Sequence, residues 1–145
     1  MDVLKIAAVA LFLSGCVAPT QPVVGSTSDF SDETLRLINA YRSSSGLRPL
    51  SPHPVLQQLA RQHSERQARG NRMSHDGYRQ RAAQAKRAGL TARCAENVGY
   101  RQRDARHLFT LWKNSPGHNV NLLRPNLRYA GMSVVNGYST YFACG

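Results

Sequence analysis

The sequence predicts an α+β domain in which helices come first and an antiparallel sheet forms late. Helical patterns, with apolar residues three and four positions apart, fill most of residues 31–88 and return at 104–115. A strand-like run covers residues 94–100. Two further runs, 129–135 and 138–144, flank Asn136-Gly137, the dipeptide that most strongly favours a type I′ hairpin. Helices followed by strands in this way are typical of the α+β class.

The first sixteen residues are predicted to be a lipoprotein signal peptide. Lys5 precedes the apolar run 6–13, which is too short to span a bilayer as a helix. The stretch LSGC at 13–16 resembles a bacterial lipobox, so we expect cleavage before Cys16 and its lipidation; the alternative is an ordinary secretory signal. Several acyl chains on Cys16 would anchor the protein stably in a membrane.

The expected location is therefore the cell envelope. Because Val17 rather than Asp follows the cysteine, a Gram-negative host would be expected to sort the protein to its outer membrane, with the domain in the periplasm or at the cell surface. Residues 17–29, VAPTQPVVGSTSD, are small, polar and proline-bearing, and they are predicted to form a flexible tether. The folded domain is then expected to cover residues 30–145.

The first two helices have recognisable starts and buried faces. Ser31 is the expected N-cap of the first helix, with Asp32 and Glu33 in its first turn, and Gly46 ends it. Pro52 and Pro54 introduce the second helix. One of its faces carries Leu56, Leu59, Ala60, His63 and Gln67. His63 is predicted to be a half-buried histidine with satisfied hydrogen bonds and not a ligand.

Three later helices are expected. An alanine-rich helix covers residues 78–88 and stops at Gly89. Asp104 caps the next, whose buried face carries Ala105, Leu108, Phe109 and Trp112. That helix stops at Ser115, because Pro116 cannot continue it. A short helix over 119–123 follows, so that His118 would lie near its start.

Two cysteines remain once Cys16 is assigned to the lipobox. Outside the cytoplasm, Cys94 and Cys144 are expected to pair. Closing a loop of about 50 residues stabilises a fold by about 4 kcal/mol in the chain-entropy model. Because no C-x-x-C spacing occurs, a zinc–thiolate or thioredoxin-type site is not expected.

The chain is strongly basic, with a formal net charge of +11. Only Lys5, Lys86 and Lys113 are lysines, so arginine carries most of this charge, and guanidinium groups bind phosphate and carboxylate bidentately. The partners expected at an envelope are anionic lipid headgroups, lipopolysaccharide phosphates or wall carboxylates. The alternative is a solvated surface that keeps the protein soluble. Nucleic acid is not expected, because the basic stretch offers only Tyr78 and Tyr100 for stacking and no known binding motif.

Three residues could carry chemistry. His118 near a helix N-terminus would tend to be neutral and able to accept a proton or bind a metal; a solvent-facing turn residue is the alternative. His75 lies in a comparable break between two helices. Glu96 lies in a strand-like run, where a carboxylate is costly unless something pairs with it; alternatively it accepts backbone N–H bonds as a structural strut.

Taken in order, four segments resemble the CAP superfamily of cysteine-rich secretory and pathogenesis-related proteins, especially its single-domain bacterial members. They are MSH at 73–75, AENVG at 95–99, LWKNSPGHNVNLL at 111–123 and YAGMSV at 129–134. INAYRSSSGLRPL at 38–50 matches the opening helix and loop of the family. The resemblance covers about residues 31–145. It implies a three-layer α-β-α sandwich with a central antiparallel sheet.

The resemblance also implies a cleft lined by two histidines and two acids. His75 and His118 match the histidines and Glu96 matches one acid, whereas the second acid position is Ser115, a form shared by many bacterial members. Some relatives bind a divalent metal through the two histidines. Zinc or another divalent cation is therefore a candidate cofactor at His75 and His118, with Glu96 orienting a water or a histidine. With one acid missing, such a site would be weak or partly occupied.

Three hypotheses for function follow from these residues. The first is a non-catalytic module that holds a lipid, anionic or wall-derived envelope ligand in a metal-modulated cleft. The second is a hydrolase of esters or peptides, with Glu96 as base to a metal-bound water, or with Ser115 activated by His118, although no G-x-S-x-G motif supports that version. The third is a structural role. Binding is favoured, because no complete catalytic constellation can be assembled.

Overall fold

The computed structural model describes residues 27–90 and 93–145. The predicted signal peptide, the lipidation of Cys16 and most of the predicted tether lie outside these residues and stay predictions. Across the described part of the chain, no helix is both long and apolar enough to cross a bilayer.

Five helices and four strands form the described domain. In chain order they are α1 (Thr27–Ser44), β1 (Ser51–Pro52), α2 (Pro54–Arg69), α3 (Tyr78–Arg87), β2 (Ala95–Tyr100), α4 (Ala105–Asn114), α5 (Pro116–Leu122), β3 (Tyr129–Val135) and β4 (Tyr138–Cys144). The strand order in the sheet is β1-β3-β4-β2. The β2–β4 and β3–β4 pairs are antiparallel, and the two-residue β1 pairs in parallel with β3.

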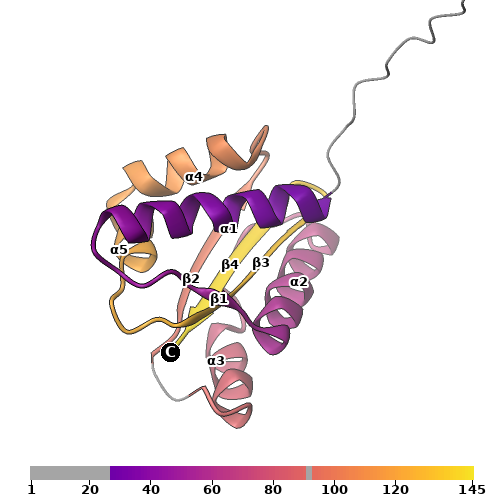
Figure 1. Ribbon diagram of the computed structural model, residues 1–145. Coiled ribbons are helices and arrows are strands. Elements are labelled where there is room, and N and C mark those ends of the chain that lie inside the picture. Colours follow the sequence, from indigo (N-terminus) through magenta and orange to yellow (C-terminus); the bar gives the residue numbers. More distant parts are fainter. Residues whose placement is uncertain (1–26, 91–92) are drawn as a thin grey trace, which may run out of the picture.

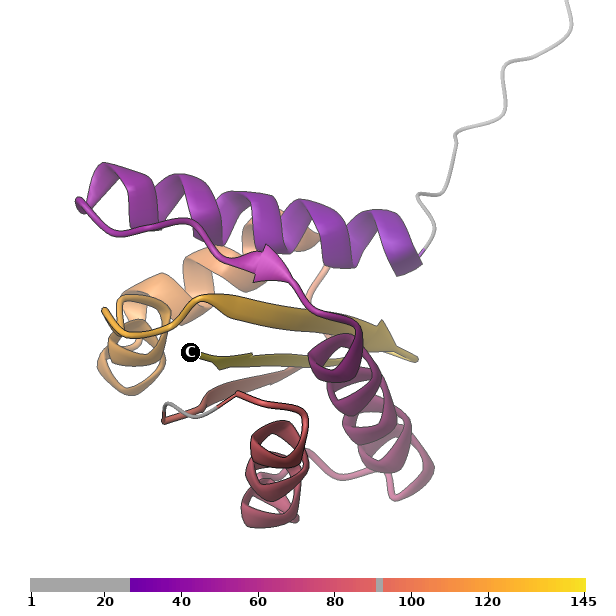
Figure 2. The same ribbon diagram turned by 60° about the horizontal axis from the view of Figure 1, so that its bottom comes forward.

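Helices cover both faces of the sheet, as the resemblance implied. Helices α1 and α4 lie on one face, and α2 and α3 lie on the other (Figures 1 and 2). Each face has its own apolar core. Ile38, Leu108 and Trp112 belong to the first core, and Leu56 and Phe142 to the second. The three-layer α-β-α sandwich is confirmed, and its β2 edge is where the site residues gather.

Glycine explains how closely α2 approaches the sheet. A Cβ atom at Gly131 in β3 would lie 2.2 Å from the backbone carbonyl atoms of Leu56. No real side chain tolerates this distance, so the glycine of the YAGMSV stretch lets the helix backbone rest on the strand. The tight contact holds the first turn of α2 against β3.

Several local predictions are confirmed. Asn136 and Gly137 both have positive φ, 48° and 79°, as a type I′ turn requires. The Asp104 side chain accepts a hydrogen bond from the His107 amide at the start of α4. Cys94 and Cys144 form a disulfide, which ties the segment entering β2 to the end of β4.

Two helix starts differ from the prediction. Helix α1 begins at Thr27, four residues before Ser31, and Ser31 is buried within the helix. The run TSDFSD contains several cap-type residues, and residue type alone does not say which is used. Helix α5 begins at Pro116 rather than after His118, because proline is well suited to the first position of a helix. Ser115 is its extended N-cap, and His118 lies inside the first turn.

Candidate functional site

The buried carboxylate of Glu96 is the centre of the site. Glu96 lies at the start of β2, and its side chain is 1% exposed. Arg81 of α3 binds it with a two-pronged contact: Nε donates to Oε2 at 2.7 Å and Nη2 donates to Oε1 at 2.8 Å. The sequence predicted that something must pair with this acid. The partner is an arginine, and fork-to-carboxylate contacts of this kind are among the strongest hydrogen-bonded ion pairs.

His75 reaches the same carboxylate from the loop between α2 and α3. Its Nδ1 lies 2.8 Å from Glu96 Oε1, and its side chain is 56% exposed. A carboxylate can only accept, so Nδ1 of His75 carries the proton. In the neutral ring Nε2 then keeps its lone pair, free to bind a metal or to accept a proton from a ligand.

His63 of α2 contacts both Arg81 and the loop that carries His75. It is 1% exposed, so it is fully rather than half buried, but its hydrogen bonds are satisfied as predicted. Nε2 lies 2.7 Å from the Ser74 carbonyl oxygen, and Nδ1 lies 3.1 Å from Nη1 of Arg81. Burial, followed by the positive charge of Arg81, lowers the pKa of His63. A neutral His63 can therefore accept from Arg81 and donate to Ser74.

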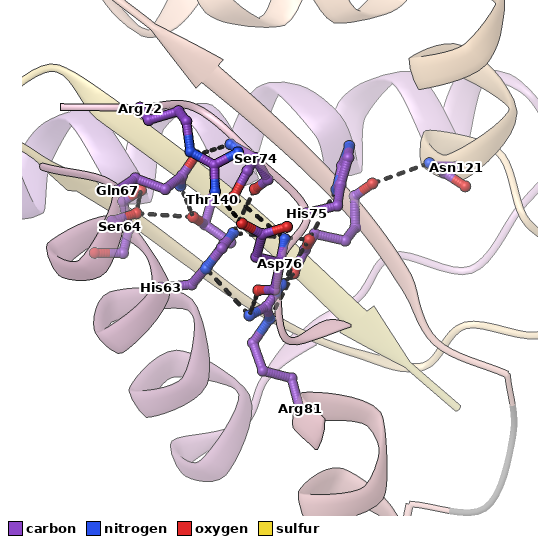
Figure 3. A network of polar contacts seen from close by, with 12 residues as sticks. His63, Ser64, Gln67, Arg72, Ser74, His75, Asp76, Arg81, Asn121 and Thr140 are labelled. Carbon is purple, nitrogen blue, oxygen red and sulfur yellow. Dashed lines mark hydrogen bonds and ion pairs between the residues drawn. The ribbon is translucent and has the colours of Figure 1, made fainter. Parts of the chain in front are cut away.

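Further polar contacts fix the loop that carries His75. Gln67 of α2 accepts a hydrogen bond from the Ser74 amide at 3.1 Å and donates to Thr140 of β4 at 3.1 Å. Nη1 of Arg81 donates to the Asp76 carbonyl oxygen at 2.8 Å. Figure 3 shows these side chains converging from α2, α3 and the sheet on the 74–76 segment. The loop is thus attached on both sides of His75.

His118 is positioned by different elements. Its Nδ1 lies 3.0 Å from Ser115 Oγ, the N-cap of α5, and its backbone carbonyl accepts from Asn97 at 3.1 Å. Asn121 connects α5 to β2 by donating to the Glu96 carbonyl oxygen and to Asn97 Oδ1. Burial, followed by the positive charge of His75, lowers the pKa of His118. The predicted neutral state is supported, although burial rather than the helix dipole is its main cause.

The cleft contains a pocket of about 270 Å³. It is lined by His75, Tyr78, Cys94, Ala95, Glu96, Asn121 and Arg124. His75 and Glu96 thus come together as predicted. Hydrogen bonds of Asn97 and Asn121 connect the α5 segment that carries His118 to Glu96, and neither His118 nor Ser115 lines this pocket.

The donor set fits a divalent metal only in part. Within residues 27–90 and 93–145, no group of three or more histidine, cysteine or acidic side chains could hold a metal ion. Both carboxylate oxygens of Glu96 accept hydrogen bonds from Arg81 or His75, so Glu96 would orient a metal ligand and would not itself coordinate the metal. His75 and His118 would supply two imidazole nitrogens, and a stable zinc site usually has three or four protein ligands.

Sequence reasoning missed three residues of the site: Arg81, Asn121 and Arg124. Arg81 lies in an alanine-rich helix with Arg79 and Arg87, and no local pattern separates it from those exposed neighbours. The available signal was Glu96 itself, because an acid in a buried strand requires a cation. Which of the many arginines supplies it depends on how α3 packs against β2.

The comparisons with known proteins agree with this architecture. A sequence model of the cysteine-rich secretory protein family (CAP) matches residues 35–145. YkwD of Bacillus subtilis, an uncharacterized protein, is 29% identical over 125 residues, which cover 84% of this chain and 49% of YkwD. This chain thus belongs to the CAP family and spans about half the length of that curated relative.

Solved structures show the same fold. A cysteine-rich secretory protein from Staphylococcus aureus superposes with a TM-score of 0.72 at 24% identity, over 83% of this chain and 40% of that one. An extracellular protein with an SCP domain from Bacillus anthracis gives 0.69 at 22% identity, over 88% and 44%. An outer surface protein of Borrelia burgdorferi gives 0.63 at 16% identity, over 76% and 86%.

Proposed function

We propose that this protein is an extracytoplasmic binding module, anchored through lipidated Cys16, whose cleft beside His75 and His118 holds an envelope ligand. A divalent cation such as zinc, bound weakly by the two imidazoles, modulates the cleft. The ligand is lipid, anionic or wall-derived. Extracellular and outer-surface relatives with the same fold support the location.

One observation favours binding over hydrolysis: the state of Glu96. A general base needs a free carboxylate oxygen within hydrogen-bond reach of the proton that it removes. Both oxygens of Glu96 are already held, one by Arg81 alone and one by Arg81 and His75. Protonating this carboxylate would break a buried ion pair. Glu96 is therefore suited to orienting His75 and not to shuttling protons.

The serine version of the hydrolase has one observation in its favour. Ser115 Oγ and His118 Nδ1 are 3.0 Å apart, which is hydrogen-bond distance for a nucleophile and its base. However, the two are the N-cap and third residue of one short helix, where such a contact arises locally. No acidic group orients the His118 ring within the described residues, and Ser115 does not line the pocket. A Ser115→Ala variant that loses ester hydrolysis would revive this alternative.

A zinc titration by calorimetry tests the metal part of the proposal. The protein from residue 17 onward, oxidised, is titrated beside His75→Ala, His118→Ala and, as a control, His107→Ala, whose histidine lies at the far end of α4. We expect weak one-to-one binding that disappears in both cleft variants and persists in the control. Unchanged binding in His75→Ala or His118→Ala would place the metal elsewhere.

The ligand part is tested with membrane and wall fractions. The immobilised protein is incubated with lipid extracts and with wall fragments, in the presence of zinc or of a chelator. Retention of one class that is reduced by His75→Ala and by the chelator is expected. Equal retention by the protein and by the His75→Ala/His118→Ala variant would contradict the proposed cleft.

A further inference from the structure

A second pocket adjoins the cleft where α3 faces Cys94 and Arg124. Its volume is about 380 Å³, and helix α3 supplies one wall with Tyr78, Ala82, Ala83 and Lys86, while Leu90, Arg93, Cys94 and Arg124 complete it. Tyr78, Cys94 and Arg124 line both pockets. We call this second pocket, with the lining residues just named, the α3 groove.

The α3 groove has a fixed guanidinium at one end. Arg124 Nη1 donates to the Cys94 carbonyl oxygen at 3.1 Å, and Nη2 donates to Asn121 Oδ1 at 3.2 Å. Tyr78 donates to the same carbonyl at 2.6 Å, and Cys94 is held by the disulfide to Cys144. An arginine carries more N–H groups than these two bonds use, so Arg124 is oriented and still able to donate to a ligand.

The charge of the α3 groove is uniformly positive. Lys86, Arg93 and Arg124 line it, and none of them forms an ion pair with a carboxylate in the part of the chain that the structure describes. Helix α3 contains no acidic residue. Glu96, an acid that lines the adjoining pocket, forms an ion pair with Arg81. Three cations without local counter-ions favour an anion in the groove.

The floor of the groove is apolar. Ala82 and Ala83 present small side chains, and Leu90 is 5% exposed between the helix and the sheet. A free inorganic anion would contact the cations but leave the apolar floor exposed to water. A ligand with an anionic headgroup and an apolar chain would cover both, and burying each methylene of the chain against the floor would strengthen binding.

We propose that the α3 groove binds an amphiphile with a phosphate monoester headgroup, placed between Arg124 and Lys86, whose alkyl chain lies over Ala82, Ala83 and Leu90. A phosphate monoester is favoured over a carboxylate because it carries up to two charges and several acceptor oxygens for three cations. This is a separate site from the histidine cleft, and it requires neither histidine nor metal.

Calorimetry with three probes tests the ligand class. Decyl phosphate, below its critical micelle concentration, is compared with inorganic phosphate and with the neutral decyl maltoside, all in the presence of a chelator. One-to-one binding of decyl phosphate is expected, at least tenfold tighter than inorganic phosphate, with no binding of the maltoside. Equal affinity for the two phosphates would overturn the role of the apolar floor. Binding of the maltoside would overturn the role of the cations.

Variants locate the site. Lys86→Gln and Arg124→Gln should each weaken decyl phosphate about tenfold, and Ala83→Glu, on the exposed side of α3, should abolish binding. Arg87→Gln removes the same charge from the next residue of the helix, which does not line the groove, and it should change affinity less than twofold. If Arg87→Gln costs as much as Lys86→Gln, the attraction is general and no site exists.

The histidine variants separate the two proposals. His75→Ala should lose zinc and retain decyl phosphate within twofold. Loss of decyl phosphate binding in His75→Ala would instead assign the anion to the cleft and refute a separate groove. The folded state of every variant is checked by circular dichroism before titration.

Discussion

Two arginines of the described residues are buried, one on each side of the sheet, and their hydrogen-bond acceptors differ in charge. Arg81 is 3% exposed and Arg42 is fully buried. Burial lowers the pKa of both guanidinium groups, and the charge of Glu96 opposes that shift at Arg81. Arg81 faces a carboxylate. Within residues 27–90 and 93–145, Arg42 of α1 donates only to backbone carbonyl oxygens, those of Arg48, Leu122, Arg124 and Leu127.

This difference distinguishes Arg81, which belongs to the candidate site, from Arg42, which is a structural clamp on the backbone. Arg42 gathers the end of α5 and the 124–127 segment around one cation, and the negative end of the α5 dipole suits that charge. The acceptors of Arg42 are backbone atoms, so they are present whichever side chains those residues carry. Arg81 depends on one particular acid, and that acid in turn orients His75. The Arg81–Glu96 pair thus stabilises the packing of α3 on β2 and also orients His75, whereas Arg42 holds backbone segments together.

The largest effect is expected from breaking the Arg81–Glu96 pair on one side. Arg81→Met leaves a buried carboxylate without its cation and should lower the free energy of unfolding by about 3–5 kcal/mol. The measurement is denaturant unfolding followed by the fluorescence of Trp112. In the double variant Arg81→Met/Glu96→Gln much of this loss should return, because no buried charge remains. A double variant as unstable as the single one would mean that Arg81 acts by packing alone.

A smaller loss is expected at the clamp. Arg42→Met leaves neutral carbonyls, not a charge, without a partner, and each unsatisfied buried group costs about 1–3 kcal/mol with relaxation reducing the sum. We therefore expect a total of about 2–3 kcal/mol in the same unfolding assay. Zinc binding should be unaffected. A loss above that of Arg81→Met would contradict the contrast between the two arginines.

A third effect concerns metal affinity. In Glu96→Gln, the carboxylate that holds Nδ1 of His75 is replaced by a neutral amide, so the ring is oriented less firmly. Substituting a residue that hydrogen-bonds a metal ligand typically weakens metal affinity about 10–100-fold. Calorimetry with zinc should show a loss in this range. The same change made in the Arg81→Met background removes the unpaired arginine and serves as the control for folding. No loss in either background would remove Glu96 from the metal site.

The smallest effect is on the pH dependence of stability. The pKa values of His63 and His118 are lowered in the fold, so between those values and the unfolded value of about 6.5 the unfolded chain binds more protons. Stability should therefore be complete above about pH 7 and fall as the pH drops through about 6.5. His118→Asn should make the decline shallower. Denaturant unfolding at several pH values between about 5 and 7.5 measures the slope, and an unchanged slope would contradict the burial of a neutral His118.

Much of the fold could be predicted because its signals are local. Asn136-Gly137 requires positive φ at two successive residues, and only one hairpin register follows from that turn. Asp104 caps its own helix, and Pro116 separates α4 from α5. The predicted start of α1 was wrong because several neighbouring residues could serve as its cap. The choice among them depends on what the helix packs against.

The candidate site was predictable in its members but not in its connections. By itself, the sequence determined that His75, Glu96 and His118 lie in breaks or buried strands where polar side chains need partners, and that Cys94 and Cys144 pair. The tertiary structure decided that Arg81 holds Glu96, that Glu96 holds Nδ1 of His75, and that Arg124 stands between two pockets. These contacts join α3, β2 and the chain after α5, across 15 residues or more of sequence. Side-chain chemistry says that a buried carboxylate needs a cation, whereas only packing selects which one reaches it.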